Sequence, residues 1–135
     1  YENGKGVPQD DKTAVKWYKL AAEQGYAPAQ SNMGFMYAKG RGVPQDDKTA
    51  VKWYKLAAEQ GNAKAQFNMG LMYALGQGVP QDWVYAHMWE NLSASNGNEN
   101  GAKLRDLAAK NMIAADISAA QKLARECVRK KYKGC

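Results

Sequence analysis

The sequence repeats itself with a period of 36 residues. When the chain is shifted by 36 positions, Gly4–Lys39 lies over Gly40–Leu75, and 30 of the 36 pairs are identical. A third, more divergent copy starts at Gly76 and keeps the turn residues Gly78 and Pro80. A period of this length is typical of arrays in which one small structural unit stacks on the next. The repeat therefore constrains the fold more than any other feature of the chain.

The first half of the second unit has the pattern of an amphipathic helix. In Asp47–Gln60 small and aromatic residues recur three and four positions apart, while lysines occupy another face. Asp46 or Asp47 can cap the start of this helix, and Gly61 follows its last turn. Each unit is expected to contain such a helix.

A second helix is predicted over Ala63–Leu75, where the mid-helix Gly70 indicates a close backbone approach. Glycines and prolines then break the helix. Asn100–Lys110 and Ile113–Lys131 predict two more helices after the third copy. The expected loops between helices are Gly4–Asp10, Gly40–Asp46 and Gly76–Asp82.

Composition agrees with helices that pack closely and excludes a membrane span. The 135 residues include 22 alanines but only 2 phenylalanines, which suits helix packing better than a β-sandwich. The longest run of apolar residues, Leu71–Leu75, is far shorter than the roughly 20 that a transmembrane helix needs. Trp17, Trp53 and Trp89 share one position of the repeat and are expected in the core, with Trp83 as a candidate surface aromatic.

The repeated residues resemble the Sel-one-like repeat, a relative of the tetratricopeptide repeat. The resemblance rests on the string that starts at Ala65-Gln66, continues through Gly70, Tyr73 and Asp82, and closes at Gly97, with a matching earlier copy. It implies an all-α fold: a right-handed α-solenoid of antiparallel helix pairs that serves protein–protein interaction. The helices after the third frame resemble a C-terminal capping helix pair, which a solenoid needs to cover its last apolar face.

We expect a single solenoid domain over residues 1–135. It would consist of a partial first repeat over 1–27 that holds only the second helix, repeats over 28–63 and 64–99, and capping helices over 100–135. Tyr1 aligns with Tyr37 and Tyr73, so we expect the sequence to begin inside a repeat.

The differences between the first two copies predict a binding groove. Four differing pairs, at positions 28, 31, 35 and 39 and their counterparts, are three or four residues apart and share one stripe of a helix. Drift at exposed positions accounts for such a stripe. A concave binding face, which this helix lines in the tetratricopeptide relatives, also accounts for the apolar replacements. The predicted groove is lined by Ser31, Asn32, Phe35, Lys39, Lys64, Phe67, Asn68, Leu71, Leu75, Lys103 and Leu107.

Within this groove Asn32 and Asn68 have two interpretations. They can hydrogen-bond an extended peptide backbone, or they can be satisfied polar groups within the solenoid. The apolar residues would supply affinity for a protein or peptide partner, and the lysines would orient it.

Catalytic chemistry finds little support. The one histidine, His87, forms His-x-x-Glu with Glu90, but a zinc site needs three or four ligands. Ser93 and Ser95 lie on the same predicted helix as His87, and no Ser-His-acid arrangement follows from position alone. We therefore expect no enzyme, no catalytic residue, no metal and no cofactor.

Whether the two cysteines form a disulfide is relevant to the cellular compartment of the protein. Cys127 and Cys135 are eight residues apart, which is about 12 Å on a continuous helix and beyond the ~7 Å limit between the α-carbons of a disulfide. Bonding requires the helix to end between them, and Gly134 allows a reversal. The spacing resembles one found in cysteine-rich secreted relatives. We expect a disulfide and a periplasmic or secreted protein, with free thiols in a cytoplasmic adaptor as the alternative.

Three functions compete, and we favour a non-enzymatic scaffold that binds a protein or peptide segment in the groove. A hydrolase acting on a cell-wall or β-lactam-like ligand is an alternative that the resemblance to cysteine-rich relatives brings. A basic module for anionic surfaces is another, since the net charge is +6. However, residues 122–135 hold 6 of the 19 basic and 1 of the 13 acidic residues, so the excess is a C-terminal tail. A nucleic-acid footprint would be spread along the solenoid, so no nucleic acid is expected.

Overall fold

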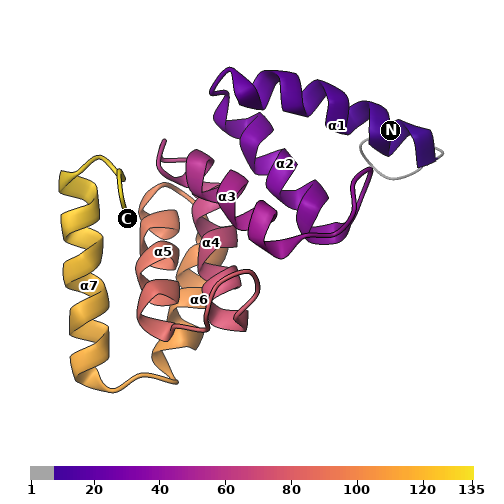
Figure 1. The fold of residues 1–135 in the computed structure, drawn as a ribbon. Coiled ribbons are helices and arrows are strands. Elements are labelled where there is room, and N and C mark those ends of the chain that lie inside the picture. The colour runs from indigo at the N-terminus through magenta and orange to yellow at the C-terminus, as the bar shows by residue number, and fades with distance from the viewer. Residues whose placement is uncertain (1–7) are drawn as a thin grey trace.

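The chain folds into a stack of helices (Figure 1). The computed structural model describes residues 8–135, and this range contains seven helices and no strand. They are α1 (Pro8–Glu23), α2 (Ala27–Lys39), α3 (Asp47–Ala58), α4 (Ala63–Leu75), α5 (Trp83–Ser95), α6 (Glu99–Ala109) and α7 (Ala114–Arg129). The predicted all-α class is confirmed, and the helices begin and end close to their expected residues.

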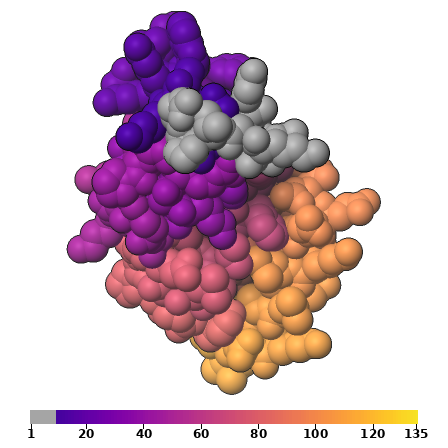
Figure 2. Space-filling view, turned by 90° about the vertical axis from the view of Figure 1, so that its right-hand side faces the viewer, coloured from indigo at the N-terminus to yellow at the C-terminus, as the bar shows by residue number. Residues whose placement is uncertain are grey.

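From α1 to α6, each helix packs on its neighbours in the sequence, whereas α7 packs on α5. α2 packs on α3 and α4 on α5 within pairs, while α1 packs on α2, α3 on α4 and α5 on α6 between pairs. In Figure 2 the surface colour passes in bands from indigo to yellow, so successive pairs follow one another along the stack. Both predicted capping helices, α6 and α7, pack on α5 (Figure 1). The arrangement is an α-solenoid.

The repeated Asp and Gly residues fix where helices begin and end. Asp46 precedes α3, and its side chain accepts a hydrogen bond from the backbone N–H of Thr49. Asp82 caps α5 in the same way, 36 residues later. Gly76 ends α4 with a φ of 67°, in the left-handed region that suits glycine. The repeat therefore fixes each connection through its own caps.

The central glycine of each loop permits a close approach to the preceding pair. A Cβ atom added at Gly78 would lie 2.5 Å from the carbonyl oxygen of Asp47, at the start of α3. Gly42 has the same relation to Asp11 in α1. The loops are thus points of contact between units, as well as turns.

The prediction for the first loop needs a correction. Most of Gly4–Asp10 lies outside the described residues, and Pro8–Asp10 form the first turn of α1. Proline suits the first helical position because its missing N–H would have no partner there and its φ is already helical. Tyr1, predicted to align with the later tyrosines, also lies outside the described residues.

The prediction that three equivalent tryptophans are buried is wrong for one of them. Trp89 is fully buried in the cluster that includes Tyr54 of the preceding pair and Met69 of its own pair. Trp53 packs against the cluster formed by α1 and α2. This position therefore faces the preceding unit. Trp17 is 63% exposed because no helix precedes α1 within residues 8–135.

Buried amides link successive pairs. Gln30 donates a hydrogen bond to the carbonyl oxygen of Ala22, and its own side-chain oxygen accepts one from Gln60 at 2.8 Å. Gln66 repeats the arrangement in the next unit, where Asn96 is the donor at 2.9 Å. Because buried amides are costly without partners, this ladder specifies how one pair sits on the next.

Candidate interaction groove

Helices α2, α4 and α6 carry the side chains that were predicted to line a groove. Phe35 on α2, Leu75 on α4 and Leu107 on α6 are 36%, 57% and 52% exposed. Phe67 and Leu71 on α4 are half-buried. Large apolar side chains therefore reach the surface on each of these three helices.

The polar members of the predicted set differ in exposure. Lys39, Lys64 and Lys103 are exposed, and Asn32 and Asn68 are half-buried. A partner could therefore contact the lysines without any rearrangement of the helices.

The prediction for Ser31 is wrong. Its side chain is only 3% exposed, and its hydroxyl is buried without a hydrogen-bond partner. A serine side chain is too short to reach past the packed neighbours. Phe67, at the same position of the next copy, is longer and reaches the surface in part. Ser31 therefore belongs to the helix packing and not to the groove.

A cavity of about 320 Å³ lies between α4, α5 and α6, and we call it the α4–α6 cavity. Three predicted residues, Leu71, Leu75 and Leu107, contribute to its walls. Trp83, Glu90, Leu104, Lys110 and Asn111 also line it, and sequence reasoning did not place any of them at a binding site. The sequence signal that could have indicated Leu104 is its spacing of three from Leu107 on one helix face.

A second, smaller cavity of about 230 Å³ lies beside α2, and we call it the α2 cavity. It brings together Asn32, Phe35 and Lys64 from the predicted set. Arg41 also lines it, pairing with Asp11 at 3.0 Å while its guanidinium lies 5.9 Å from the centre of the Phe35 ring. Arg41 was visible as one of the six differences between copies, but its place outside the helical stripe left it out of the prediction.

Besides Ser31, four predicted residues line neither cavity: Lys39, Phe67, Asn68 and Lys103. They lie on the same three helices as the cavities. They remain candidates for contacts between the cavities and at their edges.

One of the residues that line the α4–α6 cavity, Glu90, is a buried acid. Glu90 is fully buried, and neither carboxyl oxygen has a hydrogen-bond partner. Burial raises the pKa of Glu90 to about 9 from its ordinary 4.5. The side chain is therefore protonated and uncharged at neutral pH. Gly70 makes room for it, because an added Cβ atom there would collide with the carboxyl group.

The prediction that Gly70 indicates a close backbone approach is thus only partly right, since the close neighbour is a side chain. An equivalent contact between a glycine and a side chain occurs one unit earlier, where Gly34 faces the ring of Tyr54. Glu90 and Tyr54 are 36 residues apart and occupy equivalent positions of the repeat. In the third copy, a carboxyl group in the cavity lining therefore occupies the position that an aromatic ring occupies in the second copy.

His87 lies one turn before Glu90 on α5 and is also buried. Burial lowers its pKa, and the positive charge of Arg105 lowers it further, so its imidazole is neutral at pH 7. Within residues 8–135 no three His, Cys, Asp or Glu side chains come together as a metal site. The Nδ1 atom of His87 is buried without a hydrogen-bond partner.

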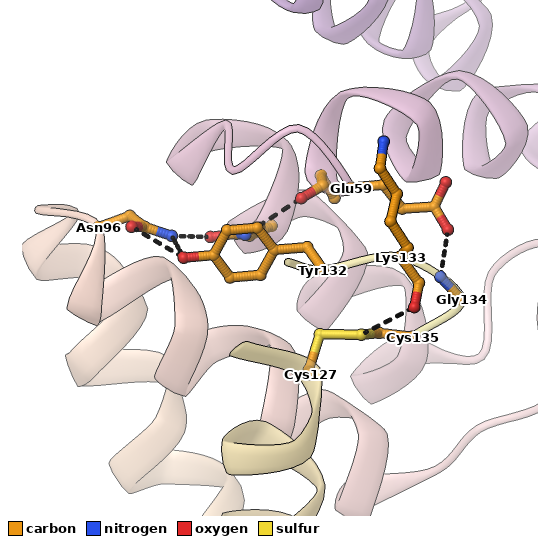
Figure 3. The surroundings of a disulfide bond; sticks show 9 residues. Glu59, Asn96, Cys127, Tyr132, Lys133, Gly134 and Cys135 are labelled. Carbon is orange, nitrogen blue, oxygen red and sulfur yellow. Dashed lines mark hydrogen bonds between the residues drawn. A yellow bond between two sulfur atoms is a disulfide. The ribbon is translucent and has the colours of Figure 1, made fainter. Parts of the chain in front are cut away.

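The C-terminal tail folds back onto the solenoid (Figure 3). Cys127 and Cys135 form a disulfide with α-carbons 5.8 Å apart, and α7 ends between them as the pairing requires. The Tyr132 hydroxyl hydrogen-bonds with the Asn96 side chain, and the N–H of Gly134 donates to Glu59 at 3.0 Å. The tail therefore joins α7 to the ends of α3 and α5.

In the part of the chain that the structure describes, no helix is long and apolar enough to cross a membrane.

These features define a class of protein: an α-solenoid whose helix pairs recur every 36 residues. The Sel1 repeat family matches residues 1–26, 27–62 and 63–98, and the chain belongs to this family. The resemblance found in the sequence is thereby confirmed. The division into 1–27, 28–63, 64–99 and 100–135 stays a prediction.

Two solved structures are similar to the chain. One is a protective antigen present in uropathogenic Escherichia coli strains that displays an SLR fold, at 32% identity and a TM-score of 0.90 over 95% of this chain. The chain spans 28% of that antigen's length. The other is a Sel1 repeat protein from Oxalobacter formigenes, at 42% identity and a TM-score of 0.68 over 78% of this chain and 80% of that one. The comparison with curated proteins gives no significant match.

Proposed function

We propose that the chain is a non-enzymatic scaffold that binds a peptide segment of a partner protein along α2, α4 and α6. Sel1 repeats are generally protein–protein interaction modules, which supports this class of function. The observation that carries the proposal is the exposure of Phe35, Leu75 and Leu107 beside two cavities. Leu75 and Leu107 line one cavity together, and large apolar side chains that are exposed side by side are a usual mark of an interaction site.

The two cavities suggest how a peptide would lie. An apolar side chain of the partner would enter the α4–α6 cavity, while a second would contact Phe35 at the α2 cavity. Buried apolar anchors of this kind supply most of the affinity of an interface. Lys39, Lys64 and Lys103 are exposed on the same three helices and would favour acidic residues in the intervening peptide.

A selection experiment tests the proposal and does not require the partner to be identified. Short peptides would be selected from a displayed library against the folded chain, and their contacts mapped by NMR chemical-shift changes. The expected changes fall on α2, α4 and α6. Changes confined to the basic end of α7, around Arg129 and Lys130, would contradict the groove and favour binding of anionic groups by the tail.

We also propose that the protein functions in an oxidising compartment, either the periplasm or outside the cell. The bonded pair Cys127–Cys135 supports this, because structural disulfides persist where thiols are not kept reduced. Thiol alkylation of the protein in fractionated source cells, before any reduction, tests it. Blocked alkylation in an envelope or secreted fraction is expected. Two reactive thiols in a cytoplasmic fraction would contradict it.

A further inference from the structure

The α4–α6 cavity combines apolar walls with one unsatisfied polar group. Both carboxyl oxygens of Glu90 are buried without a partner, while leucines, alanines and Trp83 form most of the lining. Glu90 and Lys110 are the only titratable residues among the lining side chains, and Lys110 is exposed. A buried polar group without a partner costs free energy, so a ligand that satisfies it would gain affinity.

The charge of such a ligand follows from its surroundings. A cation would require Glu90 to ionise among apolar side chains, and Lys110 would repel it. Lys110 would attract an anion, but it is exposed and screened by water, whereas the anion would lose its hydration against the leucine walls. A neutral carboxyl group offers one O–H donor and one carbonyl acceptor. An amide offers the complementary acceptor and donor side by side, so it can pair with both at once.

We propose that the α4–α6 cavity binds an uncharged amide carried on an apolar group, with the amide hydrogen-bonded to the carboxyl group of Glu90. This proposal deepens the proposed function and rests on it in one respect: a partner peptide would supply the amide as a glutamine or asparagine side chain next to an apolar residue. Leu71, Leu75 and Leu107 would pack against the apolar part.

Three small probes that share a phenyl ring test the chemistry of the cavity. Phenylacetamide, phenylacetate and phenethylamine would be titrated at pH 7 into the chain, with the Trp83 indole N–H signal followed by NMR. We expect phenylacetamide to bind about tenfold more tightly than either charged probe, because charge is costly in this site. Tighter binding of the amine or the carboxylate, or equal binding of all three, would overturn the proposal.

Two variants separate Glu90 from the rest of the cavity. Glu90→Gln keeps a donor and an acceptor, so its phenylacetamide affinity should stay within about threefold of the wild type. Glu90→Tyr places at this site the residue that already fits against Gly34 one unit earlier, so it should fill the cavity and abolish binding. Circular dichroism establishes that each variant is folded. Unchanged affinity in a folded Glu90→Tyr variant would contradict the inference.

The failure of this inference and that of the proposed function are distinguishable. If phenylacetamide binds as described but no library peptide contacts α2, α4 or α6, the cavity assignment holds and the peptide function fails. If peptides bind along the groove but selected sequences bind equally well after each glutamine or asparagine is replaced by leucine, the amide assignment fails and the peptide function holds.

Discussion

Gly70 on α4 and Glu90 on α5 fit together because the glycine has no side chain: a Cβ atom at position 70 would collide with the Glu90 carboxyl group. One unit earlier, a Cβ atom at Gly34 would lie 2.5 Å from the ring of Tyr54. The two contacts are equivalent in the repeat but differ in their surroundings. Glu90 borders a cavity of about 320 Å³ into which it can move.

Substitution of the two glycines should therefore have unequal effects. Gly34→Ala forces a rigid, buried ring to shift and should lower the free energy of unfolding by about 1–3 kcal/mol. Gly70→Ala can displace Glu90 towards the cavity, so its net cost should be smaller. The gain in helix propensity of up to about 1 kcal/mol is common to both substitutions. Urea denaturation measures both. A larger loss for Gly70→Ala would contradict the packing described.

Glu90 should make the stability of the chain depend on pH. Its pKa is about 9 in the folded chain because of burial, against the ordinary 4.5 when the chain unfolds. Between these values the folded chain holds a proton that the unfolded chain has released, so stability falls as the pH rises. Below about 4.5 and above about 9 both states carry the same charge at this site, and the effect is flat.

The matched control for this effect is Glu90→Gln, which does not titrate at that position. Between pH 5 and 9 the wild type should lose stability relative to the variant by up to about 1.4 kcal/mol per pH unit. Urea unfolding of both proteins at pH 5, 7 and 9 measures the difference. A difference that stays constant across this range would show that Glu90 is not held protonated by burial.

Loss of the disulfide should free the C-terminal tail. Replacing Cys127 and Cys135 together by serine removes a constraint on a short loop and should cost about 2–3 kcal/mol. Amide exchange at Gly134, whose N–H donates to Glu59, should become faster. Added reductant should reproduce both effects in the wild type and leave the double variant unchanged. Equal stability of the wild type with and without reductant would contradict a stabilising disulfide between Cys127 and Cys135.

The equivalent tryptophans should differ widely in their contribution to stability. Trp89→Ala removes a fully buried ring and should cost about 3–5 kcal/mol. Trp17→Ala removes a ring that is 63% exposed and should cost about 1 kcal/mol or less. Thermal and urea unfolding of the two variants compare them directly. Similar losses would mean that Trp17 is covered in solution.

The fold could be predicted from the sequence because each of its determinants is local and repeats. Asp82 caps one helix, Gly76 ends another, and Gly78 allows the loop to approach Asp47, so the same signals recur in each unit. The exposure of Trp17 could not be predicted in this way. It depends on a neighbouring unit, and residues 8–135 provide none on that side.

The site was predicted less completely, because its cavities form between units. The stripe of differences located Leu71 and Leu75, and Leu107 was predicted on the next helix, but nothing in the pattern indicated that the three share a cavity. Glu90 was considered only with His87. It occupies the repeat position of Tyr54, and a carboxyl group at that position is unusual. Ser31 was included from its spacing alone, and the burial of so short a side chain depends on neighbours that spacing does not describe.

The affinity of a library-selected peptide for matched surface variants tests the central claim most directly. Leu75→Asp with Leu107→Asp places two charges on the groove at exposed positions, where the fold should tolerate them. Leu56→Asp on α3 is the control, since Leu56 is comparably exposed at 47% and lies off the groove helices. If the peptide binds along α2, α4 and α6, we expect affinity to fall at least about tenfold in the double variant and less than about twofold in the control. Equal affinity of the double variant and the wild type would contradict it.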